Sequence, residues 1–259
     1  MPGIELNNIE LYYEEYGDGE DIVVLLHCFL SSSKMWIRDY IPELSKRYKV
    51  YAIDVRGHGN SRGVKAGCNL EQMARDLHQF LLLKDVDKCI LAGMSMGGAI
   101  AIQFAINFPG KIKALILMNP GPGSIFSKGF SFISPILSFL AQKKFLLRPF
   151  LKSVLVNPLP GDKLSEFVDD AALVGKETWL QYLNPENKIR NYDRLKTMNA
   201  KTLVIIGEKD QVAAVRFQED VADTIPNAVK IMVNNEGHAI AMENPGKVLS
   251  EIDRFLAGV

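Results

Sequence analysis

The sequence predicts an α/β protein built on a mostly parallel, doubly wound sheet, with a helical segment inserted between two of the strands. Short apolar runs recur along the chain, each ends in turn residues, and helical patterns separate them. Such runs are typical of strands buried on both faces, because crossover helices cover a parallel sheet from both sides. The expected strands are residues 22–26, 50–53, 89–92, 114–118, 202–206 and 229–233.

Helical patterns lie between these runs. Residues 70–83 carry apolar side chains at spacings of three and four, which predicts an amphipathic helix. Residues 97–107 are rich in small side chains and predict a second helix, which Phe108 and Pro109 end. Residues 6–16 alternate around two asparagines and predict a hairpin at the edge of the sheet.

The alternation of strand and helix stops between Gly121 and Asn199. This stretch shows helical spacing and no buried-strand run. It is also rich in aromatic side chains and prolines. We therefore predict a helical cap over residues 121–199, and a core domain formed by residues 1–120 and 200–259.

Composition excludes several classes of protein. The 259 residues include 30 Lys plus Arg and 30 Asp plus Glu, so the formal net charge is zero. With 47% hydrophobic residues, the chain is neither disordered nor collagen-like. A balanced charge also argues against general nucleic-acid binding, which needs a basic excess. The three cysteines, none in a CxxC pair, predict neither a zinc site nor a redox pair: Cys28, Cys68 and Cys89.

The first ten residues, MPGIELNNIE, lack the basic and apolar regions of a signal peptide. The most apolar long stretch, residues 129–141, is shorter than the ~20 residues that span a bilayer, and Pro135 interrupts it. We therefore expect a cytoplasmic protein without a membrane span. The sequence leaves open whether it is a monomer or a dimer.

The sharpest chemical signal is the run GMSMG, whose serine is Ser95. It follows the expected strand 89–92 and opens the helix 97–107. A serine at such a turn is held in a strained conformation that lifts its hydroxyl clear of the sheet, and it requires small neighbours. The N–H groups of the following helix point into the same space. We predict that Ser95 is a nucleophile; the alternative is a tight turn packed by glycine.

A serine hydroxyl becomes a good nucleophile when a base, itself oriented by an acid, accepts its proton. His238 follows the last expected strand, so its loop leaves the sheet at the same edge as Ser95. Asp210 follows the strand before it and is the preferred acid. Glu208 competes, but its place directly after Gly207 is less suited to reach His238.

Four motifs then occur in a set order, with GEKD at residues 207–210 between the last two. The chain resembles the α/β-hydrolase superfamily, in the group of capped esterases, enol-lactonases, carbon–carbon bond hydrolases and cofactor-free perhydrolases. This resemblance implies the α/β-hydrolase fold and the order nucleophile, acid, base along the chain. The four motifs are LLHCF at 25–29, DVRGHGNS at 54–61, GMSMGG at 93–98 and EGHAIAMENP at 236–245.

The resemblance also implies an oxyanion hole formed by the backbone N–H groups of Phe29 and Met96. Cys28 stands where the family usually has glycine, which bears on the conformation of this loop. His27 and His58 are expected to have structural roles within their motifs.

An apolar pocket is expected beside Ser95, lined by Phe29, Phe126, Phe130 and Ile133. The predicted function is a serine hydrolase that cleaves a carboxylic ester, a lactone or a related acyl compound, acting on a small apolar acyl substrate without metal or organic cofactor. Two alternatives stay open. One is a carbon–carbon bond hydrolase of ring-cleavage products; the other is a non-catalytic ligand receptor on the same scaffold.

Overall fold

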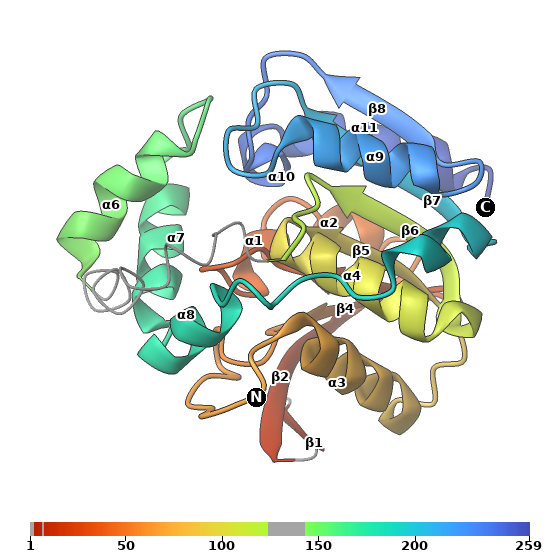
Figure 1. Cartoon of the computed structure of the whole chain (residues 1–259), viewed down its shortest axis with the longest axis horizontal. Helices are drawn as coiled ribbons and strands as arrows, with labels where there is room; N and C mark the ends of the chain where they lie inside the picture. The colour runs from red at the N-terminus through yellow and green to blue at the C-terminus, as the bar shows by residue number, and fades with distance from the viewer. Residues whose placement is uncertain (1–2, 7, 124–142) are drawn as a thin grey trace.

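A computed structural model describes residues 3–6, 8–123 and 143–259 (Figure 1). Its sheet has the strand order β1-β2-β4-β3-β5-β6-β7-β8. The pairs β1–β2 and β2–β4 are antiparallel, and every other pair is parallel. This confirms the mostly parallel, doubly wound sheet. The strands are β1 (Gly3–Leu6), β2 (Ile9–Tyr16), β3 (Ile22–Leu26), β4 (Lys49–Ile53), β5 (Cys89–Met94), β6 (Ile112–Met118), β7 (Lys201–Gly207) and β8 (Val229–Val233).

Each of the six apolar runs forms a strand, and the structure lengthens some by one or two residues. The central strand β5 is buried along its whole length. Burial follows from the layers: Figure 1 shows α4 and α9 in front of the sheet and α2 and α11 behind it. The remaining helices outside the β6–β7 connection are α1 (Lys34–Ile37), α2 (Ile41–Leu44), α3 (Leu70–Leu83), α4 (Met96–Asn107), α9 (Val215–Thr224), α10 (Ile240–Glu243) and α11 (Pro245–Leu256). There are also two 3₁₀ turns, η1 (Pro109–Lys111) before β6 and η3 (Tyr192–Thr197) before β7.

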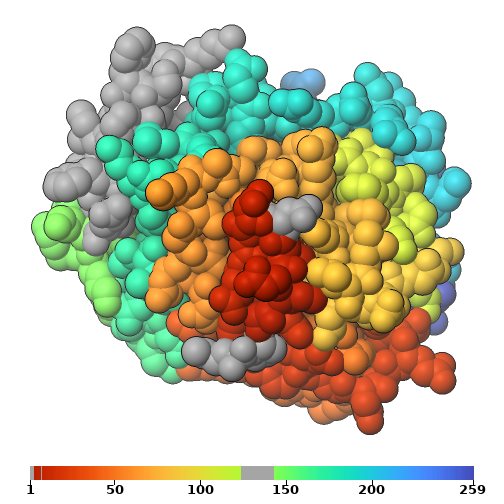
Figure 2. Space-filling view, turned by 90° about the horizontal axis from the view of Figure 1, so that it is seen from below, coloured from red at the N-terminus to blue at the C-terminus, as the bar shows by residue number. Residues whose placement is uncertain are grey.

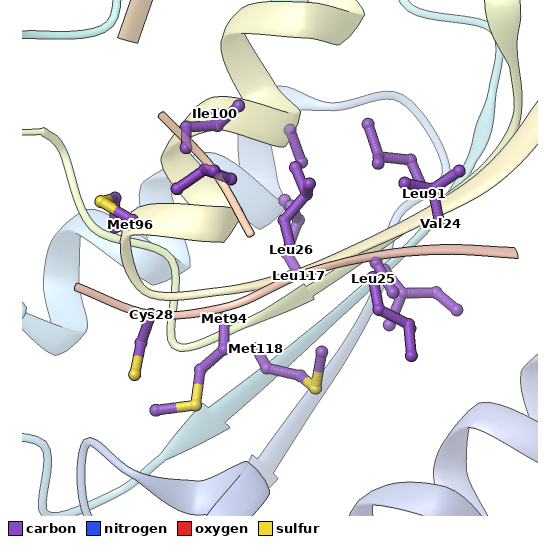
Figure 3. Packing of buried hydrophobic residues seen from close by; sticks show 14 of the residues in the cluster. Val24, Leu25, Leu26, Cys28, Leu91, Met94, Met96, Ile100, Leu117 and Met118 are labelled. Carbon is purple, nitrogen blue, oxygen red and sulfur yellow. The ribbon is translucent and has the colours of Figure 1, made fainter. Parts of the chain in front are cut away.

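The hydrophobic core is fully buried where α4 packs against the central strands. Side chains of β3, β5 and β6 meet there, among them Leu26, Leu91 and Leu117, and Ile100 joins them from α4 (Figure 3). Each of these four side chains is at most 1% exposed. Burying one such side chain contributes about 1.5–3 kcal/mol to the free energy of unfolding. The core therefore holds α4, and the turn that begins it, rigidly against the sheet.

The predicted hairpin forms the edge of the sheet, where β1 and β2 pair through four residues each. Figure 2 shows this red hairpin at the surface, beside the orange segment that follows β4. The backbone N–H of Tyr12 donates to Ser61 Oγ at 2.8 Å, which ties the hairpin to that segment.

Three helices lie between β6 and β7, and Figure 1 shows them to one side of the sheet: α6 (Lys144–Ser153), α7 (Gly161–Leu173) and α8 (Lys176–Tyr182). Helix α7 is joined to the core through Asp170, which is buried and accepts hydrogen bonds from Ser32 Oγ and Lys34 Nζ. Asn187, beyond α8, accepts the N–H of Leu70 at 2.9 Å. The division into a core and a cap remains a prediction.

None of the helices in the described part of the chain is long and apolar enough to cross a membrane.

Candidate active site

Ser95 lies at the end of β5, in the turn that opens α4. Its φ of 52° and ψ of −110° are rare for a residue with a side chain and cost about 1–3 kcal/mol. The flanking glycines allow the turn to be this tight. A Cβ on Gly97 would lie 2.2 Å from the carbonyl oxygen of Leu26, and one on Gly93 would lie 2.3 Å from the carbonyl oxygen of Gly97.

The structure brings Ser95, His238 and Asp210 together at the carboxyl edge of the parallel strands. His238 Nε2 lies 2.7 Å from Ser95 Oγ, and His238 Nδ1 lies 2.8 Å from Asp210 Oδ2. An ionised carboxylate only accepts hydrogen bonds, so Nδ1–H donates to Asp210 and Nε2 is left to accept the serine proton. The side chain of Asp210 is fully buried, and that of His238 is 11% exposed.

Asp210 is held by donors on both oxygens. Oδ1 accepts the N–H groups of Val212 at 2.8 Å and Ala213 at 2.9 Å, while Oδ2 accepts Gln218 Nε2 at 2.8 Å. These bonds satisfy a carboxylate that burial would otherwise penalise. Glu208 instead is exposed and accepts the N–H of Asn235, so it does not compete for His238.

Asn119, directly after β6, connects the two loops that carry Asp210 and His238. It is fully buried and has a left-handed φ of 43°. Its amide nitrogen donates to the carbonyl oxygens of Gly237 at 2.6 Å and His238 at 2.8 Å. Its amide oxygen accepts the N–H of Gly207 at 2.7 Å. One side chain thus fixes the end of β7 relative to the histidine loop.

Two backbone N–H groups bear on the predicted oxyanion hole, one at the start of α4 and one in the loop after β3. Met96 is the first residue of α4, so its N–H has no acceptor within the helix. Phe29 N–H finds no acceptor among the residues that the structure describes. The left-handed residue of the loop is Leu30, with φ 68°, and not Cys28, so a side chain at position 28 is tolerated. Burial raises the pKa of Cys28 to about 12, which keeps its thiol protonated.

Two further histidines lie beside this loop, and the ring of His58 meets that of Phe29 edge to face at 5.5 Å. His27 Nε2 accepts the N–H of Val55 at 3.0 Å, and its Nδ1 lies 2.8 Å from the carbonyl oxygen of Cys28. His58 Nδ1 lies 3.2 Å from the carbonyl oxygen of Arg56. Both rings are fully buried. Burial, with a smaller effect from His27, lowers the pKa of His58 to about 3, so this ring is neutral at pH 7.

A cavity of about 140 Å³ opens beside Ser95 and His238. Phe29 forms part of its wall and stacks on Tyr182 with ring centroids 4.5 Å apart. Phe29 also meets Trp179 edge to face at 4.9 Å. Among the described residues, the titratable side chains that line the cavity are those of Cys28, Tyr182 and His238. The other lining residues are Leu30, Met94, Gly121, Gly123, Phe150, Leu151, Val154, Phe167, Leu183, Val212, Ala213 and Ala239.

Three of the residues expected in the pocket, Phe126, Phe130 and Ile133, lie outside the described residues. The sequence reasoning missed Asn119, Gln218, Trp179 and Tyr182. A signal existed for Gln218, because it shares the buried side of α9 with apolar residues three and four positions later. Within the described residues, no group of three or more His, Cys, Asp or Glu side chains is placed to hold a metal ion.

Comparison with known proteins decides the family. The model of the "alpha/beta hydrolase fold" family matches residues 21–150, and that of the "TAP-like protein" family matches residues 177–258. The chain belongs to the α/β hydrolase fold family. An alpha/beta hydrolase domain-containing protein of Arabidopsis thaliana, VTE7, is 30% identical over 91% of this chain and 74% of its own.

Two other proteins are similar over most of the chain. Human monoacylglycerol lipase ABHD6 is 25% identical, covering 92% of this chain and 75% of its own. The crystal structure of the enol-lactonase from Burkholderia xenovorans superposes with a TM-score of 0.86. It is 20% identical, and the match covers 99% of this chain and 100% of the enol-lactonase. At this identity the structural likeness supports the α/β hydrolase fold alone.

Proposed function

We propose that the protein is a serine hydrolase that cleaves a carboxylic ester, a lactone or a related acyl compound through an acyl-enzyme on Ser95. The observation that carries this proposal is the continuous hydrogen-bond chain Ser95–His238–Asp210, with links of 2.7 and 2.8 Å. It supplies a nucleophile, a base and an orienting acid in the geometry that acyl transfer requires.

In the proposed reaction, Ser95 Oγ attacks the carbonyl carbon while His238 Nε2 takes the hydroxyl proton. The imidazolium that forms is stabilised by Asp210 and then gives the proton to the leaving alcohol oxygen, so that an acyl-serine remains. Water attacks the acyl-serine with His238 again acting as base. The product acid leaves and Ser95 regains its proton.

The N–H groups of Phe29 and Met96 are proposed to bind the oxygen that becomes negative in the tetrahedral intermediate. The first turn of α4 favours negative charge at the same place. Each such donor is worth roughly 3–4 kcal/mol in the transition state.

An uncharged, apolar acyl group fits the cavity best, because its walls are mostly apolar and aromatic. We propose that residues 121–199 form a cap, with α8 contributing Trp179 and Tyr182 to the cavity wall. The names of the relatives, a monoacylglycerol lipase and an enol-lactonase, fit the same ester and lactone chemistry.

Hydrolysis of p-nitrophenyl butyrate tests this function, with the Ser95→Ala variant as control. The proposal expects turnover by the wild type and loss of that turnover in the variant. A protein that binds the ester without turnover would be the receptor on a hydrolase scaffold. Cleavage of a ring-cleavage diketone without ester turnover would favour the carbon–carbon hydrolase.

A further inference from the structure

Helix α6 presents apolar side chains on two opposite sides. Leu147 and Leu151 point inward and are each 2% exposed. On the outward side, Phe145 is 74% exposed, Phe150 is 50% exposed and Leu146 is 37% exposed. Two exposed phenylalanines within one short helix form an apolar patch, and such patches mark surfaces that bind something.

The charges on this segment are of one sign. Residues 143–156 contain four basic side chains and no Asp or Glu. Lys144, Arg148 and Lys152 are spaced by four and therefore form a row along one side of the helix. This row lies between the buried side and the outward apolar side. We call the outward apolar residues Phe145, Leu146, Pro149 and Phe150, together with this row, the α6 face.

Of the three residues in this row, Lys144 alone has an ion-pair partner among the acidic residues of the neighbouring helix α7 that the structure describes. Asp169 pairs with Lys144 at 2.8 Å, whereas Asp162 and Glu166 pair with Arg38 of the core. Arg148 donates to an uncharged partner, Ser165 Oγ, at 3.2 Å. Lys152 has no ion-pair partner among the described residues.

The α6 face is also next to the cavity. Phe150 belongs to the face and, with Leu151 from the inward side, lines the cavity that contains Ser95. Figure 1 shows α6 as the outermost helix on its side of the molecule. A flat surface could therefore contact α6 without meeting the sheet, and it would lie close to the cavity.

We propose that the α6 face docks on an anionic lipid surface. Exposed phenylalanine and leucine beside a row of lysine and arginine is the pattern of a helix that lies in the membrane interface, with its apolar side among the acyl chains. The basic row then faces the negative headgroups. A second copy of this chain fits the face poorly, because two α6 faces brought together would oppose like charges.

Sedimentation with vesicles tests this proposal, using the full chain carrying Ser95→Ala so that binding is measured without hydrolysis. Vesicles contain either phosphatidylcholine alone or equal parts of phosphatidylcholine and phosphatidylglycerol. We expect binding to the anionic vesicles, weaker binding to the neutral ones, and release by salt. Arg148→Gln and Lys152→Gln should each weaken anionic binding by roughly fivefold.

The apolar contribution is tested by the double variant Phe145→Ser, Leu146→Ser, which should lower binding by at least about tenfold. The matched control is Leu82→Ser, Leu83→Ser on α3, two leucines that are 52% and 51% exposed. This control should bind as the parent does. In the wild-type background, both double variants should hydrolyse a short soluble ester at the wild-type rate.

Several results would overturn the docking proposal: no sedimentation with either vesicle, equal sedimentation with both, or equal loss in both double variants. Self-association that depends on Phe145 and occurs without vesicle binding would assign the face to a second copy instead. If the protein binds vesicles and the wild type hydrolyses no ester, the proposed enzymatic function fails while the docking surface stands.

Discussion

Around Ser95, residues that take no part in the proposed chemistry set the distances between those that do. Asn119 holds the loops of Asp210 and His238 together through three hydrogen bonds. Gln218 donates to the same carboxylate oxygen that accepts the hydrogen bond from His238 Nδ1–H. The 2.7 Å separation of His238 and Ser95 thus depends on buried amides contributed by two other elements.

Replacing Asp210 should have a far larger effect than replacing its neighbour Glu208. Asp210→Asn misorients His238, and the corresponding change in a serine protease lowers kcat by about 10⁴-fold. Glu208→Gln should stay within about tenfold of the wild type, because Glu208 is exposed and bonds only a loop N–H. Turnover of p-nitrophenyl butyrate measures both variants, and the reverse ranking would disprove the assignment of the acid.

Asn119→Ala should lower kcat by up to about 100-fold through displacement of the histidine loop, with little change in KM. Asn119→Asp should not restore it, since a carboxylate would face the carbonyl oxygens of Gly237 and His238. Gln103→Ala is the matched control, because Gln103 is also a fully buried amide but bonds Asn107 and Arg190. Both alanine variants should lose stability, and equal kcat values in the two would show that Asn119 has no positioning role.

His58 should make the protein less stable in mild acid. Its pKa falls from 6.5 to about 3 on folding, mainly through burial, so below pH 6.5 the unfolded chain binds a proton that the folded chain does not. The free energy of unfolding therefore decreases as the pH falls, by roughly 2 kcal/mol between pH 7 and pH 5 from this residue. In urea unfolding, His58→Asn should lose less stability over that interval than the wild type. Identical losses would contradict this account.

At the scale of elements, local sequence encodes the strand–turn–helix unit from β5 to α4 more directly than it encodes the cavity wall. Gly93, Ser95 and Gly97 are neighbours in sequence, so the turn and its strain could be predicted. The cavity wall instead joins Phe29 of one loop to Trp179 and Tyr182 of α8, about 150 residues further along. That pairing depends on where α8 docks, which the pattern of residues 121–199 does not specify.

Trp179 should limit the length of the acyl group. Its Nε1 has no hydrogen-bond partner among the described residues, so Trp179→Phe enlarges the cavity without breaking a hydrogen bond seen there. We expect the ratio of kcat/KM for the hexanoate ester over the butyrate ester to rise by roughly fourfold, the effect of burying about one more methylene. Trp36→Phe is the control, because Trp36 is buried and lies outside the cavity wall, and its Nε1 also lacks a partner in the part of the chain that the structure describes. If the two variants shift the ratio equally, Trp179 does not set the acyl length.

At the scale of the whole molecule, the order of the strands brings distant residues to one edge. Ser95, Asp210 and His238 each follow a parallel strand, and the sequence indicated all three because strand ends are visible as apolar runs followed by turns. Asn119 also follows such a strand. The sequence pattern assigns no role to this position. Its bridging role depends on the approach of two other loops, which a pattern within one strand does not reveal.

The central claim is that Ser95 carries the acyl group. The most direct measurement is peptide mapping by mass spectrometry after reaction with a fluorophosphonate, applied to the wild type and to His238→Ala. We expect one adduct, on the peptide that contains Ser95, formed rapidly by the wild type and far more slowly without the base. An adduct on another residue, or labelling of Ser95 at the same rate in both proteins, would contradict it.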